Sequence, residues 1–377
     1  TIWEQSVVEH EKTWVVNTRP KLPGAKFRNE DHHQTHDKES YERCSPPFEE
    51  RVEEGSFSLD AEWQFQHDNS QMRYFVEPDK TPNFDLRNGY SDRDIQGDEN
   101  FIKTLEHILQ WILANKSELI PLADFDFVTS RGRLTKVFCT PYDDELEWSL
   151  AITKFQGVFY INEVETESAC CYRQNRTESH KENMYWGYMF KQYTLDGVPD
   201  STGVVTYNEA FCSVVRTCLS DHRLLFSGEV DCRDRENAEA PPACYVELKI
   251  SREINTVKKR SKFHRFKLLK WWAQSFLLGV PSIVVGFRND VGRVLSVRTY
   301  RTTEIPQLGE YRSLAWKPEV CMNFCSDFLS FVKRVVIEDD PHVVYLFSRK
   351  AGSSVTFTEH RNSTYCFLPD WYVTEMR

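Results

Sequence analysis

Two short acidic patterns, separated by a loop, constrain this chain more than any other part of its sequence. Glu229 and Asp231 lie two residues apart in an extended, apolar-flanked run, and Glu247 and Lys249 have the same spacing in a second run. Successive side chains on a strand alternate between faces, so residues i and i+2 share a face. If the two runs pair through the intervening loop, three carboxylates and one ammonium meet on one face of a sheet.

Three carboxylates held close together repel one another and raise a pKa unless a cation neutralises them. A divalent cation that prefers oxygen ligands, Mg²⁺ or Mn²⁺, would do this, and the Lys249 ammonium would lie beside it. Such a metal lowers the pKa of a bound water and offsets the charge that builds up on phosphoryl oxygens. The pattern therefore predicts a metal-dependent nuclease, although similar short pairs also arise by chance in charged strands.

Composition limits the class of protein. The chain has 377 residues, of which 40% are hydrophobic and 14% aromatic, so we expect a substantial core. No apolar run approaches the roughly 20 residues of a membrane helix, and we expect no membrane association. The net charge of −10 restricts any nucleic-acid site to a local positive cleft. The eleven cysteines lack zinc-ribbon spacing, which favours reduced thiols in an intracellular protein of the nucleus, the cytoplasm or both.

Residues 1–54 are polar and mixed, and we expect an N-terminal extension that is partly irregular. It contains His32, His33 and His36, which form either a solvated cluster or a metal site. Residues 55–377 show no linker or repeat. They are expected to form a single α+β domain with a central mixed β-sheet flanked by helices.

Periodicity predicts the elements of this domain. Helices are expected after Asp98 and at 181–193, 208–219, 267–278 and 320–335. Strands are expected at 134–138, 148–155, 158–165, 204–205, 224–231, 245–250, 282–287 and 343–347, followed by a hairpin-like segment at 354–367. The expected helix at 267–278, ended by Gly279, lies between the expected strands at 245–250 and 282–287. This order indicates a crossover that places both strands in one sheet. Glu163 and Glu165 also share a strand face, either solvated, paired with arginine or joined to a metal site.

Several basic residues are candidates for substrate contact. Lys270 and Gln274 follow Lys267 at helical spacing, which places them on one polar stripe that either faces the cleft or is solvated. The run 258–267 interleaves basic and aromatic residues, which is typical of phosphate contact and base stacking; a nuclear-import signal or plain surface charge is the alternative. Arg131 lies in the segment Ser130–Arg133, expected to be a glycine-bearing loop that suits an anion-binding guanidinium.

Taken together, these motifs resemble the DXO decapping exoribonuclease family, which are RNA 5′-end quality-control enzymes with a PD-(D/E)xK nuclease-like core. The resemblance covers most of the chain but not roughly the first 50 residues. It is carried by Phe57–Asp60, Pro82–Arg87, Arg131–Lys136, Gly228–Cys232, Tyr245–Lys249, Lys267–Leu277, Val320–Cys325 and Phe367–Tyr372.

The resemblance implies a site and an activity. Glu229, Asp231, Glu247 and the Leu248 carbonyl would hold Mg²⁺ or Mn²⁺. Lys249 and Gln274 would contact the reacting phosphate region, and Arg131 would contact the substrate. The implied substrates are RNA 5′ ends: capped, NAD-capped, triphosphate or monophosphate. The implied reactions are removal of incomplete or NAD-type caps, release of 5′ pyrophosphate, and 5′→3′ exoribonuclease digestion.

One residue departs from the family pattern. The family motif Gly-Tyr-x-Phe-Glu supplies a further acidic residue, whereas here the run Gly187–Lys191 ends in lysine. An ammonium at this position repels a metal ion and can pair with a remaining carboxylate; alternatively, Lys191 points to solvent and the three acids suffice. Two functions therefore stay open: a metal-dependent hydrolase of RNA 5′ ends, or an RNA 5′-end-binding regulator with weakened catalysis. A DNA nuclease fits the family resemblance less well.

Overall fold

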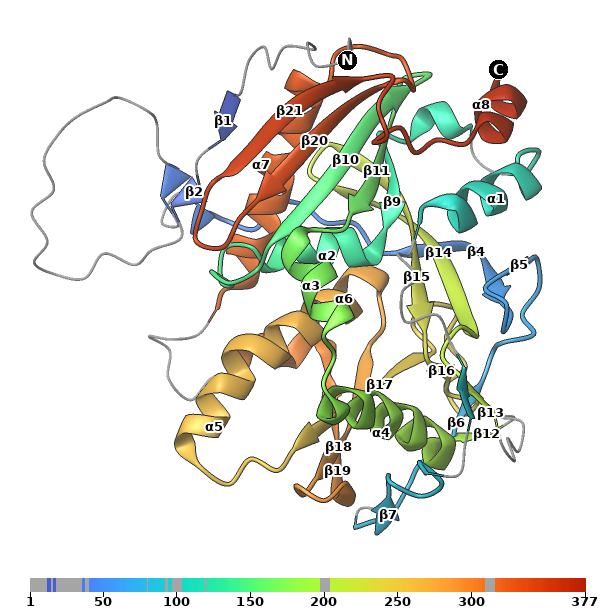
Figure 1. The fold of residues 1–377 in the computed structure, drawn as a ribbon, viewed down its shortest axis with the longest axis vertical. Coiled ribbons are helices and arrows are strands. Elements are labelled where there is room, and N and C mark those ends of the chain that lie inside the picture. Colours follow the sequence, from blue (N-terminus) through green and yellow to red (C-terminus); the bar gives the residue numbers. More distant parts are fainter. Residues whose placement is uncertain are drawn as a thin grey trace, which may run out of the picture.

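A computed structural model describes residues 41–79, 81–91, 104–118, 121–196, 204–308 and 316–377, together with short strands at 12–14, 16–17, 36–37 and 94–96. The architecture is α+β, as predicted, but the strands form two large mixed sheets rather than one central sheet (Figure 1).

The larger sheet has ten strands. Its order is β1 (Lys12–Trp14), β21 (Val355–Arg361), β20 (Val343–Arg349), β10 (Trp148–Phe155), β11 (Val158–Val164), β9 (Phe127–Ser130), β15 (His222–Val230), β14 (Ala210–Leu219), β4 (Val52–Leu59) and β5 (Phe65–Gln66). β9 pairs in parallel with both β11 and β15, and the other pairings in this sheet are antiparallel.

The second sheet has seven strands. Its order is β12 (Leu195–Asp196), β6 (Tyr74–Phe75), β16 (Cys232–Arg233), β17 (Tyr245–Arg252), β18 (Ser282–Arg288), β19 (Arg293–Arg301) and β7 (Phe84–Asp85). β17 and β18 are parallel, so the predicted crossover is confirmed. Two small sheets pair β13 (Val204–Thr206) with β8 (Asp94–Gln96) and β2 (Val16–Asn17) with β3 (His36–Asp37).

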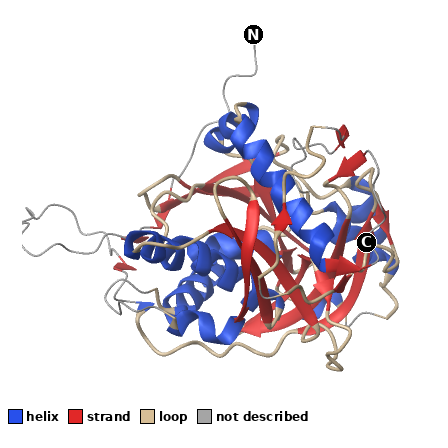
Figure 2. Cartoon of the chain, turned by 90° about the horizontal axis from the view of Figure 1, so that it is seen from below, coloured by secondary structure: helices blue, strands red, loops and turns tan. Residues whose placement is uncertain are grey.

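The helices cover these sheets. They are α1 (Glu106–Ala114), α2 (Arg131–Cys139), α3 (Glu167–Gln174), α4 (Glu178–Thr194), α5 (Val257–Lys262), α6 (Leu269–Leu278), α7 (Pro318–Val335) and α8 (Asp370–Met376), with a π-helical segment (Phe263–Leu268) and 3₁₀ turns at Leu122–Asp124 and Thr302–Gln307. α1 and α8 pack on one face of the larger sheet, and α2 and α7 on the other. Figure 2 shows the strands gathered in the interior with helices against them.

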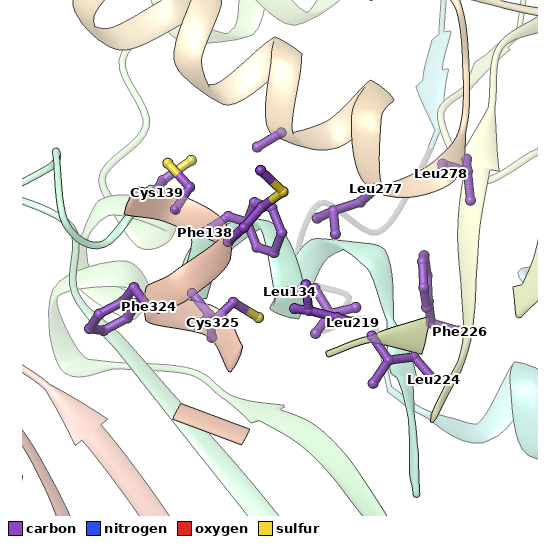
Figure 3. Packing of buried hydrophobic residues seen from close by; sticks show 14 of the residues in the cluster. Leu134, Phe138, Cys139, Leu219, Leu224, Phe226, Leu277, Leu278, Phe324 and Cys325 are labelled. Carbon is purple, nitrogen blue, oxygen red and sulfur yellow. The ribbon is translucent and has the colours of Figure 1, made fainter. Parts of the chain in front are cut away.

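The helices α2 and α6 join the two sheets. α2 packs on β9 and β15 of the larger sheet, α6 on β18 of the smaller one, and the two helices contact each other. Figure 3 shows Leu134 and Phe138 of α2 in one apolar layer with Leu277 of α6, Cys325 of α7 and Phe226 of β15. Burial of such side chains contributes roughly 1.5–3 kcal/mol each, so this layer anchors α2 against α6, α7 and the larger sheet.

Three predictions of local structure are wrong. Residues 134–138 form part of α2, because Leu134, Val137 and Phe138 recur at helical spacing and pack as one face. Arg131 is therefore the first residue of a helix and does not lie on a loop. Residues 210–219, expected as a helix, form β14, which lies between β15 and β4 and is buried on both faces, so its sequence lacks strand alternation.

The predicted N-terminal extension is described only from Tyr41 onward, apart from short strands. Tyr41 is buried, and β4 starts at Val52, before the predicted boundary at residue 54. The histidine side chains at 32, 33 and 36 lie outside the described residues, and the division into extension and domain stays a prediction. Among the described residues, we find no helix with the length and apolar character that crossing a membrane requires.

Candidate active site

The site forms where the chain passes from one sheet to the other. β15 ends at Val230 in the larger sheet, and β16 starts at Cys232 in the smaller one, so Asp231 lies at the junction. Of the strands β15 and β16, which flank Asp231, it is the short β16 that pairs with β17, through Cys232 and Val246. The two acidic runs thus meet through a change of sheet and not through the pairing of β15 with β17.

Asp231 is held by two donors. Its Oδ2 accepts a hydrogen bond from the Leu248 backbone N–H at 2.8 Å, and its Oδ1 lies 2.5 Å from Lys191 Nζ. The side chain is 7% exposed. Burial raises the pKa of Asp231, and the Lys191 charge opposes that shift.

Glu247 and Lys249 share one face of β17, as predicted from alternation. Lys249 Nζ lies 2.7 Å from Glu247 Oε1, and Arg131 Nη1 lies 4.0 Å from Glu247 Oε2. Arg131 also donates to the Glu229 carbonyl oxygen at 3.0 Å. Burial alone would raise the pKa of Glu247, but Lys249 and Arg131 outweigh it and hold that pKa below its usual value.

Lys191 reaches the site from α4, the helix predicted at 181–193. The helix is capped at its N-terminus by Thr177, whose side chain accepts the His180 N–H, and its apolar side packs on β17 and β18. Lys191 Nζ lies between two acids, 2.5 Å from Asp231 and 3.9 Å from Glu229 Oε1. Burial lowers the pKa of Lys191, but these carboxylates raise it overall, so the ammonium stays charged.

The remaining predicted substrate contacts lie on α6 and just before it. Gln274 Oε1 is buried and has no hydrogen-bond partner among the described residues. Burial, Lys249 and Lys136 lower the pKa of Lys270. Lys267 belongs to the π-helical segment and donates to Ser251 Oγ at 3.1 Å, so the predicted polar stripe is interrupted by a π turn.

The basic run 258–267 is mostly on the surface. Lys258, Lys259 and Arg260 are exposed on α5, and Lys259 donates to Asn255. Glu163 pairs with Lys136, and Glu165 pairs with Arg173 at 2.8 Å. The predicted pairing with arginine is therefore confirmed for Glu165, whereas Glu163 pairs with a lysine. The eleven cysteines are free thiols.

A cavity of about 760 Å³ opens on the acids. It is lined by Lys191, Glu229, Asp231 and Lys249, whereas Arg131, Lys270 and Gln274 lie outside its lining. Its walls include residues that sequence reasoning missed, namely Arg73, Tyr188, Tyr207, Phe211 and Trp271. Tyr188 was detectable, because it lies three residues before Lys191 in the same motif. The others come from distant segments that only the fold brings together.

The residue types suit an oxygen-preferring divalent cation, because Glu229, Asp231 and Glu247 provide carboxylate oxygens around one end of β15. As the side chains lie, however, no group of three or more His, Cys, Asp or Glu residues in the described ranges is placed to hold a metal ion. Lys191 and Lys249 already contact two of these carboxylates. A cation at these acids therefore competes with the Lys191 ammonium.

Comparison with known proteins identifies the family of this chain. The model of the RAI1-like PD-(D/E)XK nuclease family matches residues 51–373. The decapping and exoribonuclease protein of Bos taurus is 47% identical over 87% of this chain and 85% of its own, and that of Homo sapiens is 46% identical over 88% and 86%.

Among solved structures, S. pombe Rai1 in complex with 3′-FADP is 26% identical, with a TM-score of 0.70 over 85% of this chain and 97% of its own. The predicted family and fold class are both confirmed. This chain belongs to the RAI1-like PD-(D/E)XK nuclease family.

Proposed function

We propose that this protein is a divalent-metal-dependent hydrolase of RNA 5′ ends, acting in decapping and as a 5′→3′ exoribonuclease. The observation that carries the proposal is the convergence of Glu229, Asp231, Glu247 and Lys249 at the junction of the two sheets, beside a cavity. The names of the Bos taurus and Homo sapiens relatives support this reaction class. The nucleotide ligand of S. pombe Rai1 supports the substrate class.

Each residue has a proposed role. Glu229, Asp231, Glu247 and the Leu248 carbonyl would hold Mg²⁺ or Mn²⁺, and such a metal would supply a bound water of lowered pKa and positive charge beside the phosphoryl oxygens. Lys249 orients the attacking water or stabilises the charge that develops.

Residues around these acids position the substrate. Arg131, fixed at the start of α2, holds the Glu229 backbone and thereby the acid itself, in addition to its proposed contact with substrate. Gln274 and Lys270 remain proposed substrate contacts, although both lie outside the cavity lining and Gln274 Oε1 is buried without a hydrogen-bond partner among the described residues.

The proposed substrates are RNAs with incomplete caps, NAD-type caps, 5′ triphosphate or 5′ monophosphate. Tyr188 and Tyr207, half-buried in the cavity wall, provide rings on which a base can stack. We place the protein inside the cell, in the nucleus, the cytoplasm or both, where free thiols persist.

A panel of RNAs labelled near the 5′ end tests the proposal. Substrates bearing triphosphate, unmethylated cap, methylated cap, NAD or monophosphate are incubated with Mg²⁺, Mn²⁺ or chelator. We expect cleavage with either metal and none with chelator or with the Glu229→Ala/Asp231→Ala variant. Cleavage that survives both chelator and variant refutes the assigned site.

A second function is favoured by one observation, the 2.5 Å contact between Lys191 and Asp231. A lysine bound to a proposed metal ligand weakens catalysis, and the protein then serves as an RNA 5′-end-binding regulator. Lys191→Glu should then raise Mg²⁺-dependent hydrolysis and Mn²⁺ affinity, the latter measured by titration calorimetry. No gain in either quantity contradicts the regulator model, and turnover by the unmodified protein at enzymatic rates does so directly.

A further inference from the structure

The acidic site is already neutralised by cations of the protein itself. The three carboxylates of Glu229, Asp231 and Glu247 face three cationic groups, those of Arg131, Lys191 and Lys249. The Lys249 ammonium lies 2.7 Å from Glu247, within the range of charge-assisted hydrogen bonds, and the Lys191 ammonium lies closer still to Asp231, at 2.5 Å. An additional cation is therefore not required to keep the carboxylates ionised, in contrast to the expectation from the acidic pattern alone.

The ammonium of Lys191 is held in place by the packing of its helix. Phe190 is 1% exposed and packs over Gly286 of β18, so closely that a Cβ at Gly286 would lie 2.6 Å from the Phe190 ring. Tyr185 and Met189 are buried on the same side of α4. Because α4 is fixed against β17 and β18, the backbone at Lys191 cannot withdraw without breaking this core.

The cavity in front of Lys191 has the composition of a site for a phosphorylated nucleotide end. Its lining contains four cationic side chains, Arg73, Lys191, Lys249 and Lys267, and three carboxylates, Glu209, Glu229 and Asp231. Among its walls are the rings of Tyr188, Tyr207, Phe211 and Trp271. A terminal phosphate pairs with ammonium groups, and a nucleobase stacks on aromatic faces. The lining therefore has one more cationic side chain than carboxylates, and this net positive charge favours an anion in the cavity.

We infer that Lys191 is a resident cation that lets this site hold the 5′-phosphate end of RNA without a divalent metal. The inference rests on the proposed function, because it takes RNA 5′ ends as the ligand. The phosphate contacts the ammonium groups of Lys191 and Lys249 directly, while Asp231 and Glu247 keep those groups oriented. With glutamate at 191 the carboxylates outnumber the cations around them, and a metal ion becomes necessary before a phosphate can approach.

Binding of a short RNA in the absence of turnover tests this inference. The probe carries a 3′ fluorophore, phosphorothioate linkages against cleavage, and either a 5′ phosphate or a 5′ hydroxyl. Fluorescence anisotropy is measured with EDTA or with Mg²⁺. We expect the Kd of the 5′-phosphate RNA to agree within about twofold between the two conditions, and to be at least roughly tenfold lower than that of the 5′-hydroxyl RNA.

Three variants on α4 separate charge from folding. Lys191→Met should lose about tenfold in affinity with EDTA, and Lys191→Glu should bind only when Mg²⁺ is present. Lys181→Met is the matched control, because Lys181 is exposed on the same helix and lies outside the cavity lining. It should bind like the unmodified protein. Thermal unfolding of each variant confirms that the comparison is made between folded proteins.

Two results would overturn the inference alone, and a third would overturn the proposed function as well. If the unmodified protein loses tenfold or more in affinity with EDTA, the bound phosphate depends on a metal and Lys191 does not replace it. The same conclusion follows if Lys191→Met binds as tightly as the unmodified protein in EDTA. If the 5′-phosphate RNA binds no better than the 5′-hydroxyl RNA in either condition, the proposed function fails together with the inference.

Discussion

Two pairs of acids in this molecule have the same spacing and the same position at the end of a strand, but they differ in the charged residues that surround them. Glu229 and Asp231 flank Val230, the last residue of β15, and Glu163 and Glu165 flank Val164, the last residue of β11. Each pair also lines a cavity, of about 760 and 740 Å³ respectively. Neither spacing nor cavity size therefore distinguishes a catalytic candidate from an ordinary strand face.

The difference lies in what the next segment of chain supplies. After Glu165 the chain enters α3, which provides Arg173 for a two-point contact, at 2.8 and 3.0 Å, with that glutamate. After Asp231 the chain enters a second sheet, which brings a third acid, Glu247, together with Lys249. Strand alternation places two acids on one face in both pairs. The crowding of charges that perturbs pKa values arises only at Glu229 and Asp231, where a second sheet adds Glu247 and Lys249.

The largest expected contrast is in RNA chemistry. Glu229→Ala/Asp231→Ala should lower the rate of RNA 5′-end hydrolysis by about 100-fold or more, because it removes the carboxylates assigned to the metal. Glu163→Ala/Glu165→Ala should change that rate less than about twofold. Rates with 5′-triphosphate RNA and saturating Mn²⁺ give the measurement. Equal losses in the two double variants would show that the site extends to β11.

The next contrast is in stability. Lys249→Met leaves Glu247, 5% exposed, with Arg131 at 4.0 Å and the more distant charge of Lys191, and should destabilise the protein by about 3 kcal/mol. Arg173→Met breaks a more exposed pair at Glu165 and should leave the midpoint of urea unfolding within experimental error. A Lys249→Met midpoint equal to that of the unmodified protein would mean that Glu247 takes up a proton or reaches solvent.

The pH dependence of stability sharpens the same comparison. The pKa of Glu247 is held low in the folded protein, so its contribution to stability is complete above the unfolded pKa of about 4.3 and is lost as the pH falls through the folded pKa. Glu247→Gln should therefore cost about 2 kcal/mol at pH 7 and progressively less below pH 4. Urea unfolding at both pH values measures this; a penalty that grows on acidification has the wrong sign for ionised Glu247.

Sequence reasoning succeeded where the relevant contacts are local or carried by motifs. Alternation placed Glu247 and Lys249 on one face of β17, and helical periodicity located α4 with Lys191 on it. The stop signal at Gly279, which takes φ +79°, correctly ended α6. The family motifs identified the nuclease core before any geometry was known.

It failed where long-range pairing decides the outcome. β14 lies between its hairpin partner β15 and the strand β4, which is distant in sequence, and burial on both faces removes the alternation that marks an exposed strand. The change of sheet at Asp231 depends on β6 and β17 flanking a two-residue strand, which no local pattern reveals. Arg73 and Tyr207 reach the cavity from separate segments for the same reason.

The smallest expected effects concern two glycines beside Arg131, and they test how closely the acidic junction is packed. A Cβ at Gly228, the residue before Glu229, would lie 2.9 Å from Leu278 Cδ1 and 3.2 Å from Arg131 Cβ, whereas a Cβ at Gly132 would have no atom within 4 Å. Gly228→Ala should therefore destabilise the protein by about 1–2 kcal/mol and displace Arg131 from the Glu229 carbonyl.

Gly132→Ala, in the first turn of α2, should instead stabilise the protein by about 0.4–1 kcal/mol, because alanine restricts the unfolded chain and favours helix. Urea unfolding of both variants measures the two effects, and the hydrolysis rate shows whether Arg131 has moved. If both glycines tolerate alanine equally, the junction adjusts to an added methyl group. The placement of Glu229 then depends on its charge contacts with Lys191 and not on the packing of α2 and α6 behind it.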